Sequence, residues 1–145
     1  MGAIEGTNLS VGRGTDTPFE QLGAPWIDGL QLAAALNARA IPGVRFYPVR
    51  FTPVSSKYAN EECGGVFVIL TDRTAVRPVR VGLEIASAIF RMYPAQFQLM
   101  AAGRLFGSRD TLARIAAWED PSAIAASWAQ AEARWRSLRS KYLLY

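Results

Sequence analysis

The chain has 145 residues, of which 50% are hydrophobic and 19% charged, so it can form one domain with its own core and is too apolar for intrinsic disorder. It has no histidine and one cysteine, Cys63, which excludes within this chain a Ser-His-Asp triad, a histidine or multi-cysteine metal site and an internal disulfide. The net charge is only +4, the arginines are scattered, and no uncharged stretch is long enough for a membrane span, so we expect neither nucleic-acid binding nor membrane insertion.

The first third of the chain predicts mostly extended structure and one helix. Residues 3–8 are predicted as a short strand, and the glycines within 9–17 predict a loop. Extended structure is expected to resume at 18–22. Asp28 opens a capping-box pattern, which predicts a helix that ends near the next Pro-Gly pair.

Two further strands are predicted before the middle of the chain. Apolar residues alternate over 44–52, and Pro48 inside this segment indicates an edge strand or a bulge. The apolar run 65–71 is bounded by a Gly-Gly pair and a Thr-Asp pair, which is typical of a buried central strand.

The second half of the chain is alanine-rich and predicts helices. Pro78 is suited to the first turn of a helix, and Pro94 would end it. A short helix is predicted to begin at Ser108 or Asp110, and the last helix to begin at Asp120.

The last predicted helix carries an apolar stripe. Its members recur at steps of four, three, four and three: Ile124, Trp128, Ala131, Trp135 and Leu138. Such spacing indicates an amphipathic helix, and we interpret the stripe as core. The uneven order of strands and helices predicts a single α+β domain, with a mixed sheet of about four to five strands packed by about four helices.

Residues 5–15 read Glu-Gly-Thr-Asn-Leu-Ser-Val-Gly-Arg-Gly-Thr and place a carboxylate, an amide, hydroxyls and a guanidinium within one loop. The glycines that flank Arg13 allow the backbone to turn sharply and approach a ligand. Backbone N–H groups of such a loop can bind an anion, and an arginine can hold a carboxylate or phosphate through two hydrogen bonds. A structural turn, in which Asn8 and Ser10 bond their own backbone, is the open alternative.

Two other polar or aromatic segments are candidates for ligand contact. Residues 55–65 precede the buried strand, and Lys57 and Tyr58 are placed to reach a ligand at a sheet end. The adjacent glutamates there point opposite ways in extended structure, so they are no acid/base pair. Cys63 has no histidine partner and is interpreted as a packing residue. Phe19 and Trp26 are equally compatible with a sugar-binding face and with the core.

Eight short motifs occur in a fixed order along the chain: Glu5-Gly-Thr-Asn-Leu-Ser10, Gly12-Arg-Gly-Thr15, Pro18-Phe-Glu20, Gly23-Ala-Pro-Trp26, Ser56-Lys57, Cys63-Gly-Gly-Val66, Thr71-Asp72 and Tyr142-Leu-Leu-Tyr145. This order resembles the C-terminal half of a bacterial family long called a domain of unknown function. Its characterised members are exo-β-N-acetylmuramidases, glycoside hydrolases of peptidoglycan recycling. The resemblance implies that residues 1–145 are one substrate-cleft domain of a larger protein, whose N-terminal Rossmann-like domain carries the catalytic glutamates and is absent here.

The resemblance also implies a set of residues that line the cleft between the two domains: Glu5, Asn8, Ser10, Arg13, Thr15 and Lys57. Glycoside hydrolysis usually needs two carboxyl groups about 5–10 Å apart. Glu5 is the only carboxylate within the motif-dense loop, so we assign it at most a supporting role and no catalytic residue to this chain. Arg13 suits the lactyl carboxylate of N-acetylmuramic acid.

We therefore expect the substrate-binding half of a glycoside hydrolase that releases terminal N-acetylmuramic acid from peptidoglycan fragments, inactive when isolated. No metal or organic cofactor is expected. The expected partners are the N-terminal catalytic domain of the same protein and a peptidoglycan-derived sugar. Two alternatives stay open: a non-catalytic carbohydrate- or anion-binding module, and a protein-interaction domain. A large exposed apolar patch would disfavour the free module.

Overall fold

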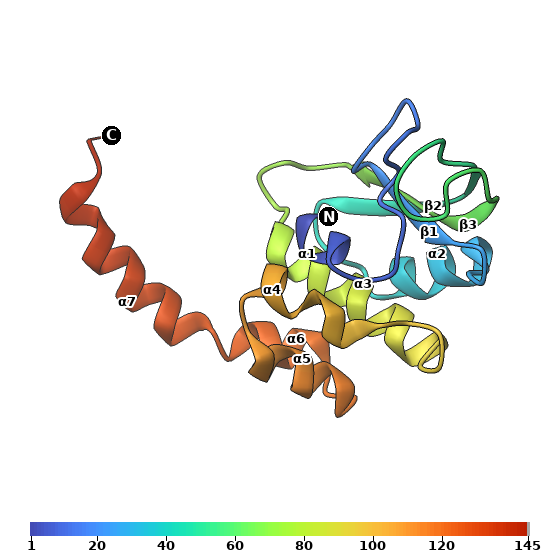
Figure 1. Ribbon diagram of the computed structural model, residues 1–145. Coiled ribbons are helices and arrows are strands. Elements are labelled where there is room, and N and C mark those ends of the chain that lie inside the picture. The colour runs from blue at the N-terminus through green and yellow to red at the C-terminus, as the bar shows by residue number, and fades with distance from the viewer. Residues whose placement is uncertain (145) are drawn as a thin grey trace.

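A computed structural model describes residues 1–144 and shows a body of packed helices and strands from which one helix extends (Figure 1). Tyr145, the last residue of the ending motif, lies outside the described residues. The α-helices and strands are α1 Gly2–Glu5, β1 Gln21–Ala24, α2 Gly29–Ala38, β2 Val44–Phe51, β3 Cys63–Leu70, α3 Pro78–Met92, α4 Gly103–Phe106, α5 Arg109–Ala116, α6 Pro121–Ala126 and α7 Ala129–Arg139. Two 3₁₀ turns complete them, η1 Leu99–Ala102 and η2 Ser140–Tyr142.

The three strands found within residues 1–144 form one antiparallel sheet in the order β1-β3-β2. Val66 of the central strand pairs with Leu22 of β1 and with Pro48 of β2. The predictions of a central strand at 65–71 and of an edge position for Pro48 are confirmed, because an edge strand can tolerate a residue without an N–H. The α+β class is confirmed as well.

The sheet is smaller than the expected mixed sheet of about four to five strands, and one predicted strand is wrong. Residues 3–8 form the short helix α1 and the turn after it. Ile4 is fully buried from this helix, and the hydroxyl of Thr7 donates to the Ile4 carbonyl at 2.7 Å, which closes the turn. A four-residue helix is too short to leave a periodic pattern in the sequence.

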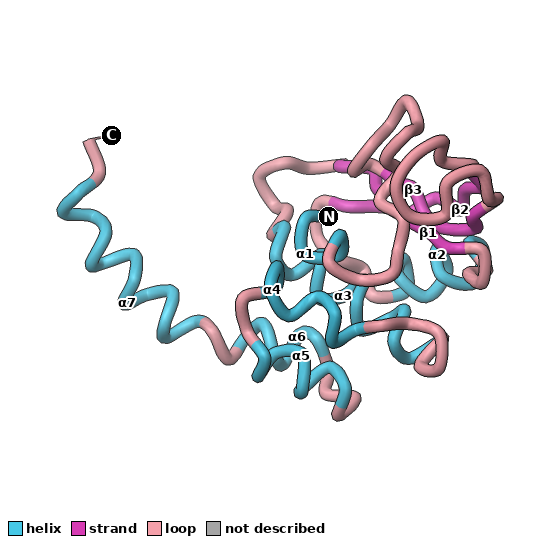
Figure 2. The backbone as a smooth tube through the Cα atoms, in the orientation of Figure 1, coloured by secondary structure: helices cyan, strands magenta, loops and turns pink. Residues whose placement is uncertain are grey.

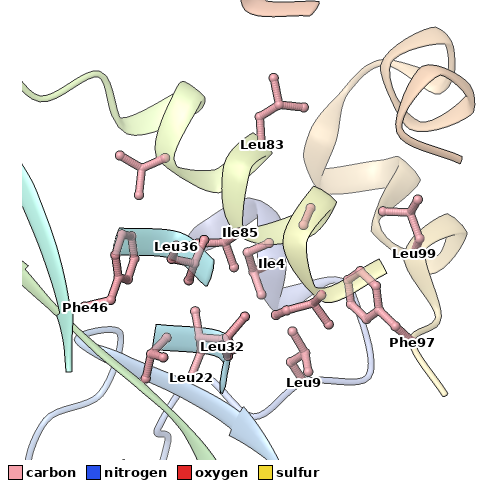
Figure 3. Close-up of a cluster of buried hydrophobic side chains, with 14 of the residues drawn as sticks. Ile4, Leu9, Leu22, Leu32, Leu36, Phe46, Leu83, Ile85, Phe97 and Leu99 are labelled. Atoms are coloured by element: carbon pink, nitrogen blue, oxygen red, sulfur yellow. The ribbon is translucent and has the colours of Figure 1, made fainter. Parts of the chain in front are cut away.

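The core lies between the sheet and α3, with α2 packed between them. Leu32 and Leu36 of α2 meet Leu22 of the sheet on one side and Ile85 of α3 on the other (Figure 3). Further α-helices, α5 and α6, pack on α3. Because neighbours surround it, α3 is the most buried helix of the described chain.

A buried carboxylate connects three of these helices. Glu84 of α3 is 1% exposed and pairs with Arg39 at 2.8 Å between Nε and Oε2. Arg39 also contacts Asp120 before α6 at 2.9 Å, and these carboxylates raise its pKa. The hydrogen bond from Arg39 lowers the pKa of Asp120 to about 2. Such a carboxylate needs its partners, because an unpaired buried charge is strongly destabilising.

The C-terminal stripe is only partly core. The predicted single helix is two helices, α6 and α7, separated by a turn at Ser127 and Trp128. Ile124 is fully buried and Trp128 is half-buried, but Trp135 is 60% exposed, so the core assignment is wrong for the outer part of the stripe. The hydroxyl of Ser127 donates to the Ile124 carbonyl at 2.7 Å where α6 ends. Beyond this turn α7 extends away from the body (Figure 2).

Candidate functional site

The segment from the last residue of α1 to the start of β1, residues 5–20, is here called the motif loop. Ser10 joins it to the sheet by pairing with Gly23, with N–O distances of 2.9 and 3.0 Å in the two directions. Near its other end, the N–H of Phe19 donates to the carbonyl of Val11 at 2.7 Å. The loop is therefore a defined structure anchored on β1, and its exposed tip carries Arg13.

Three of the six predicted site residues come together in the structure: Glu5, Arg13 and Lys57, here called the charged cluster. The Arg13 guanidinium lies within 2.6 Å (Nε) and 2.5 Å (Nη2) of Glu5 Oε1. Lys57 donates from Nζ to the backbone carbonyl of Glu5. Arg13 also lies over the Phe19 ring, 4.8 Å from its centroid. Two cations and one carboxylate give the cluster a net positive charge.

Burial and exposure differ within the charged cluster. The side chains of Arg13 and Glu5 are 47% and 33% exposed, so both are accessible to a ligand. Lys57 is half-buried, and its desolvation lowers its pKa, an effect that the charge of Glu5 opposes and that of Arg13 reinforces. A bound anion would relieve part of this cost, since an opposite charge favours the ammonium form.

The remaining three predicted site residues have their polar atoms occupied by the fold. The amide of Asn8 donates to the Gln96 carbonyl and accepts from the N–H of Gln98, both at 2.9 Å. Ser10 is buried. The hydroxyl of Thr15 donates to the Gly12 carbonyl at 2.7 Å. These contacts support the structural interpretation for the three, while their contact with a sugar stays a prediction.

The sharp turns predicted beside Arg13 are present. Gly12 and Gly14 have φ values of +74° and +78°, which glycine adopts without steric penalty. A methyl group on Gly14 would lie 2.6 Å from the Ser55 backbone nitrogen. The close approach that this glycine permits is thus to residues 53–60 of the same chain, and it brings Lys57 beside the motif loop.

The segment 53–60, which carries Lys57, has an unusual backbone conformation on both sides of this lysine. Ser56, Tyr58 and Asn60 have φ values of +68°, +58° and +65°, a region that non-glycine residues rarely enter. Backbone strain of this kind persists only where the surroundings determine it. The sequence gives a weak signal at the asparagine, which tolerates this region, and none at the tyrosine.

Trp26 is held by two tyrosines beside this loop. Its Nε1 lies 3.2 Å from the hydroxyl of Tyr58, and its ring meets Tyr93 edge-on at 5.4 Å between centroids. It also lines a groove of about 630 Å³ with Arg50 and Glu62. Trp26 is therefore partly core and partly groove wall. Tyr93, which packs against its ring, is a neighbour that sequence reasoning missed.

The described residues, 1–144, offer neither a reactive thiol nor a group of metal ligands. Cys63 is buried, and desolvation raises its pKa to about 11, so it is a neutral thiol at ordinary pH, as expected of a packing residue. The acidic and cysteine side chains in this range form no group that would bind a metal. None of the described helices has the length and apolar character of a membrane span.

Comparison with known proteins gives consistent matches along the chain. The family model described as exo-beta-N-acetylmuramidase NamZ, C-terminal, matches residues 1–145. The peptidoglycan beta-N-acetylmuramidase NamZ of Bacillus subtilis (strain 168) is 37% identical over an alignment of 147 positions, which covers 99% of this chain and 36% of that protein. The chain therefore spans little more than a third of this relative.

Two crystal structures of DUF1343 family proteins from Bacteroides fragilis NCTC 9343 share the fold. The first has a TM-score of 0.87 and 24% identity, and covers 99% of this chain and 40% of its own. The second has a TM-score of 0.65 and 22% identity, and covers 99% and 38%. In both structures the matching fold is again the smaller part of a longer chain.

Proposed function

Because the chain belongs to the exo-β-N-acetylmuramidase NamZ C-terminal family, we propose that it is the substrate-binding part of a longer glycoside hydrolase that releases terminal N-acetylmuramic acid from peptidoglycan fragments. The name of the Bacillus subtilis relative supports the reaction and the polymer. The length of that relative supports a further domain, the one expected to carry the catalytic carboxyl groups.

The charged cluster is the observation that carries the substrate assignment. N-acetylmuramic acid differs from N-acetylglucosamine by a lactyl group that ends in a carboxylate. Arg13, at the exposed tip of the motif loop, and the half-buried Lys57 supply two cations against the single carboxylate of Glu5. Charge-assisted hydrogen bonds from a guanidinium to a carboxylate are among the stronger polar contacts in proteins. Arg13 then reads the acid, and Glu5 fixes the plane of its guanidinium.

The same geometry argues against complete catalysis by this chain. Hydrolysis of a glycosidic bond usually needs an acid and a second carboxylate about 5–10 Å apart. Glu5 is committed to Arg13 at 2.6 Å and serves as its counter-ion. The carboxyl pair is therefore assigned to the preceding domain, and the 145-residue chain alone is expected to turn over no sugar.

The test compares two substrates in the full-length protein that contains this chain. Arg13→Ala should lower kcat/KM on a chromogenic N-acetylmuramide by about a hundredfold, since each factor of ten corresponds to about 1.4 kcal/mol. Arg13→Lys should recover only part of the loss, because an ammonium lacks the planar fork. Residual activity on the matching N-acetylglucosaminide should change little, and Arg45→Ala, an exposed arginine on β2, serves as the control.

Two outcomes would contradict the proposal. Equal losses on both sugars, with the fold intact, would mean that Arg13 organises the motif loop through Glu5 and does not read the acid. No loss on either sugar would mean that the charged cluster is structural.

A further inference from the structure

Helix α7 exposes apolar side chains that nothing in residues 1–144 covers. Trp135 is 60% exposed, Leu138 50% and Tyr142, just after the helix, 77%. An isolated helix of 11 residues is marginal in water, because most helical stability comes from packing. A helix that leaves the body and carries these side chains needs a partner surface.

The side of α7 that faces the body borders a groove of about 560 Å³. Trp128 and Trp135 supply its aromatic wall. Four arginines line it, from the start of α3 and from α7: Arg77, Arg80, Arg136 and Arg139. Glu132 is the one acidic residue of the lining, and it pairs with Arg136 at 3.4 Å. Arg80 also reaches the buried Glu84 at 3.5 Å, so Arg77 and Arg139 are the lining cations without an ion pair among the described residues. This excess of guanidinium groups around two indoles suits an occupant that is acidic at its edges and apolar at its centre.

Charge and chain length together point to one occupant. A second copy of this chain would set this arginine-rich arm against another, which like-charge repulsion disfavours. The relatives carry more than half of their length outside the part that matches this chain. The match to the first Bacteroides structure spans 99% of this chain and so takes in α7.

We propose that the groove between α7 and the body receives an acidic, apolar-centred segment of the domain that precedes this chain in its longer relatives. In that assembly α7 is an arm that clasps the other domain, with the two tryptophans as anchors and the arginines around them. This inference rests on the part of the proposed function that places a further domain before the chain, and it is independent of the sugar assignment.

Hydrogen exchange measured by mass spectrometry tests the arm directly. In the 145-residue chain the α7 amides should exchange rapidly, and in the full-length protein they should be protected by at least about tenfold. Arg136→Glu should remove most of that protection. Arg134→Glu is the matched control, because it makes the same charge change on the same helix at a residue that does not line the groove. Unchanged protection of β3 and α3 shows in each variant that the body is folded.

Several results would overturn the proposal. Equal exchange of α7 in the two proteins, or equal effects of the two arginine variants, would remove the docking site. A dimer of the 145-residue chain in sedimentation, with α7 protected, would assign the arm to a second copy. Protection of α7 that appears only with phosphatidylglycerol vesicles would assign the arm to a membrane surface. A gene without a preceding domain would leave the arm without its proposed partner. The sugar assays above can fail while the exchange result stands, and the reverse holds too.

Discussion

Helices α3 and α7 both carry apolar side chains at helical spacing, yet one is the most enclosed element of the chain and the other extends into solvent. Helix α3 is surrounded by α5, α6 and the side of the core that faces the sheet. Even Glu84 and Gly82 of α3 are therefore buried. Beyond its first turn α7 has no comparable neighbours within the described chain (Figure 2). The periodicity of apolar side chains thus predicts that one face of a helix is buried, but it does not predict which part of a protein covers that face.

Two leucine truncations give the largest expected contrast between these helices. Leu83→Ala removes a fully buried side chain of α3 and should lower the free energy of unfolding by about 3–5 kcal/mol. Leu138→Ala, on the half-exposed side chain of α7, should cost less than about 0.5 kcal/mol in the same 145-residue chain. Urea unfolding followed by circular dichroism measures both, and similar losses would show that α7 packs on the body in solution.

Two glutamate variants make the same comparison for charge. Glu84→Gln leaves Arg39 and Arg80 without their buried counter-ion. It should cost about 3 kcal/mol, at the lower end for a broken buried pair, because Arg39 keeps Asp120 and Arg80 keeps its hydrogen bond to Ser122. Glu132→Gln breaks an exposed pair on α7 and should change stability by less than about 1 kcal/mol. Thermal melting compares the two, and a tolerated Glu84→Gln would mean that the buried network is dispensable.

Trp128, at the turn between α6 and α7, should fall between these extremes. A fully buried tryptophan costs about 3–5 kcal/mol on truncation, and this one is half-buried, so Trp128→Ala should cost about 2 kcal/mol. Trp135→Ala provides the exposed reference in the same denaturation series. If both cost the same, the boundary between body and arm does not lie at this turn.

The smallest expected effect is the acid sensitivity of the network that holds α6 to α2. The pKa of Asp120 is lowered from 3.8 to about 2 in the folded chain by its hydrogen bond from Arg39. Its contribution is therefore present above pH 3.8 and lost as the pH falls through about 2. Solvent screening should keep this contribution below about 1 kcal/mol, because Asp120 is 46% exposed. Asp120→Asn should flatten the dependence of the free energy of unfolding on pH across this range. An unchanged dependence on pH would contradict the assignment.

Sequence reasoning succeeded where the determinants are local. The side chains of Asp28, Ser108 and Asp120 accept hydrogen bonds at the starts of α2, α5 and α6, and Pro78 opens α3. These positions could be read because a cap and its partner lie two or three residues apart.

Prediction of the site was limited by distance along the chain. The positive φ angles of the two glycines beside Arg13 follow from their residue type. The clamp of Asn8 on Gln96 spans 88 residues, and Lys57 reaches the motif loop across 52, so neither contact leaves a local pattern. For the same reason the sequence could identify Glu5, Arg13 and Lys57 as a set only through a resemblance.

The three left-handed residues around Lys57 imply a trade-off between the stability of the fold and the precise placement of the Lys57 ammonium. Each non-glycine residue in this conformation raises the energy of the folded chain by about 1–2 kcal/mol. Glycine at Ser56, an exposed position, would relieve its share and would also loosen the segment that presents the ammonium. Selection for heat resistance alone would favour such replacements, whereas the proposed role of Lys57 in the full-length protein would make selection for activity retain the strained serine. On that proposal, stability and activity should pull a population of variants in opposite directions within residues 53–60.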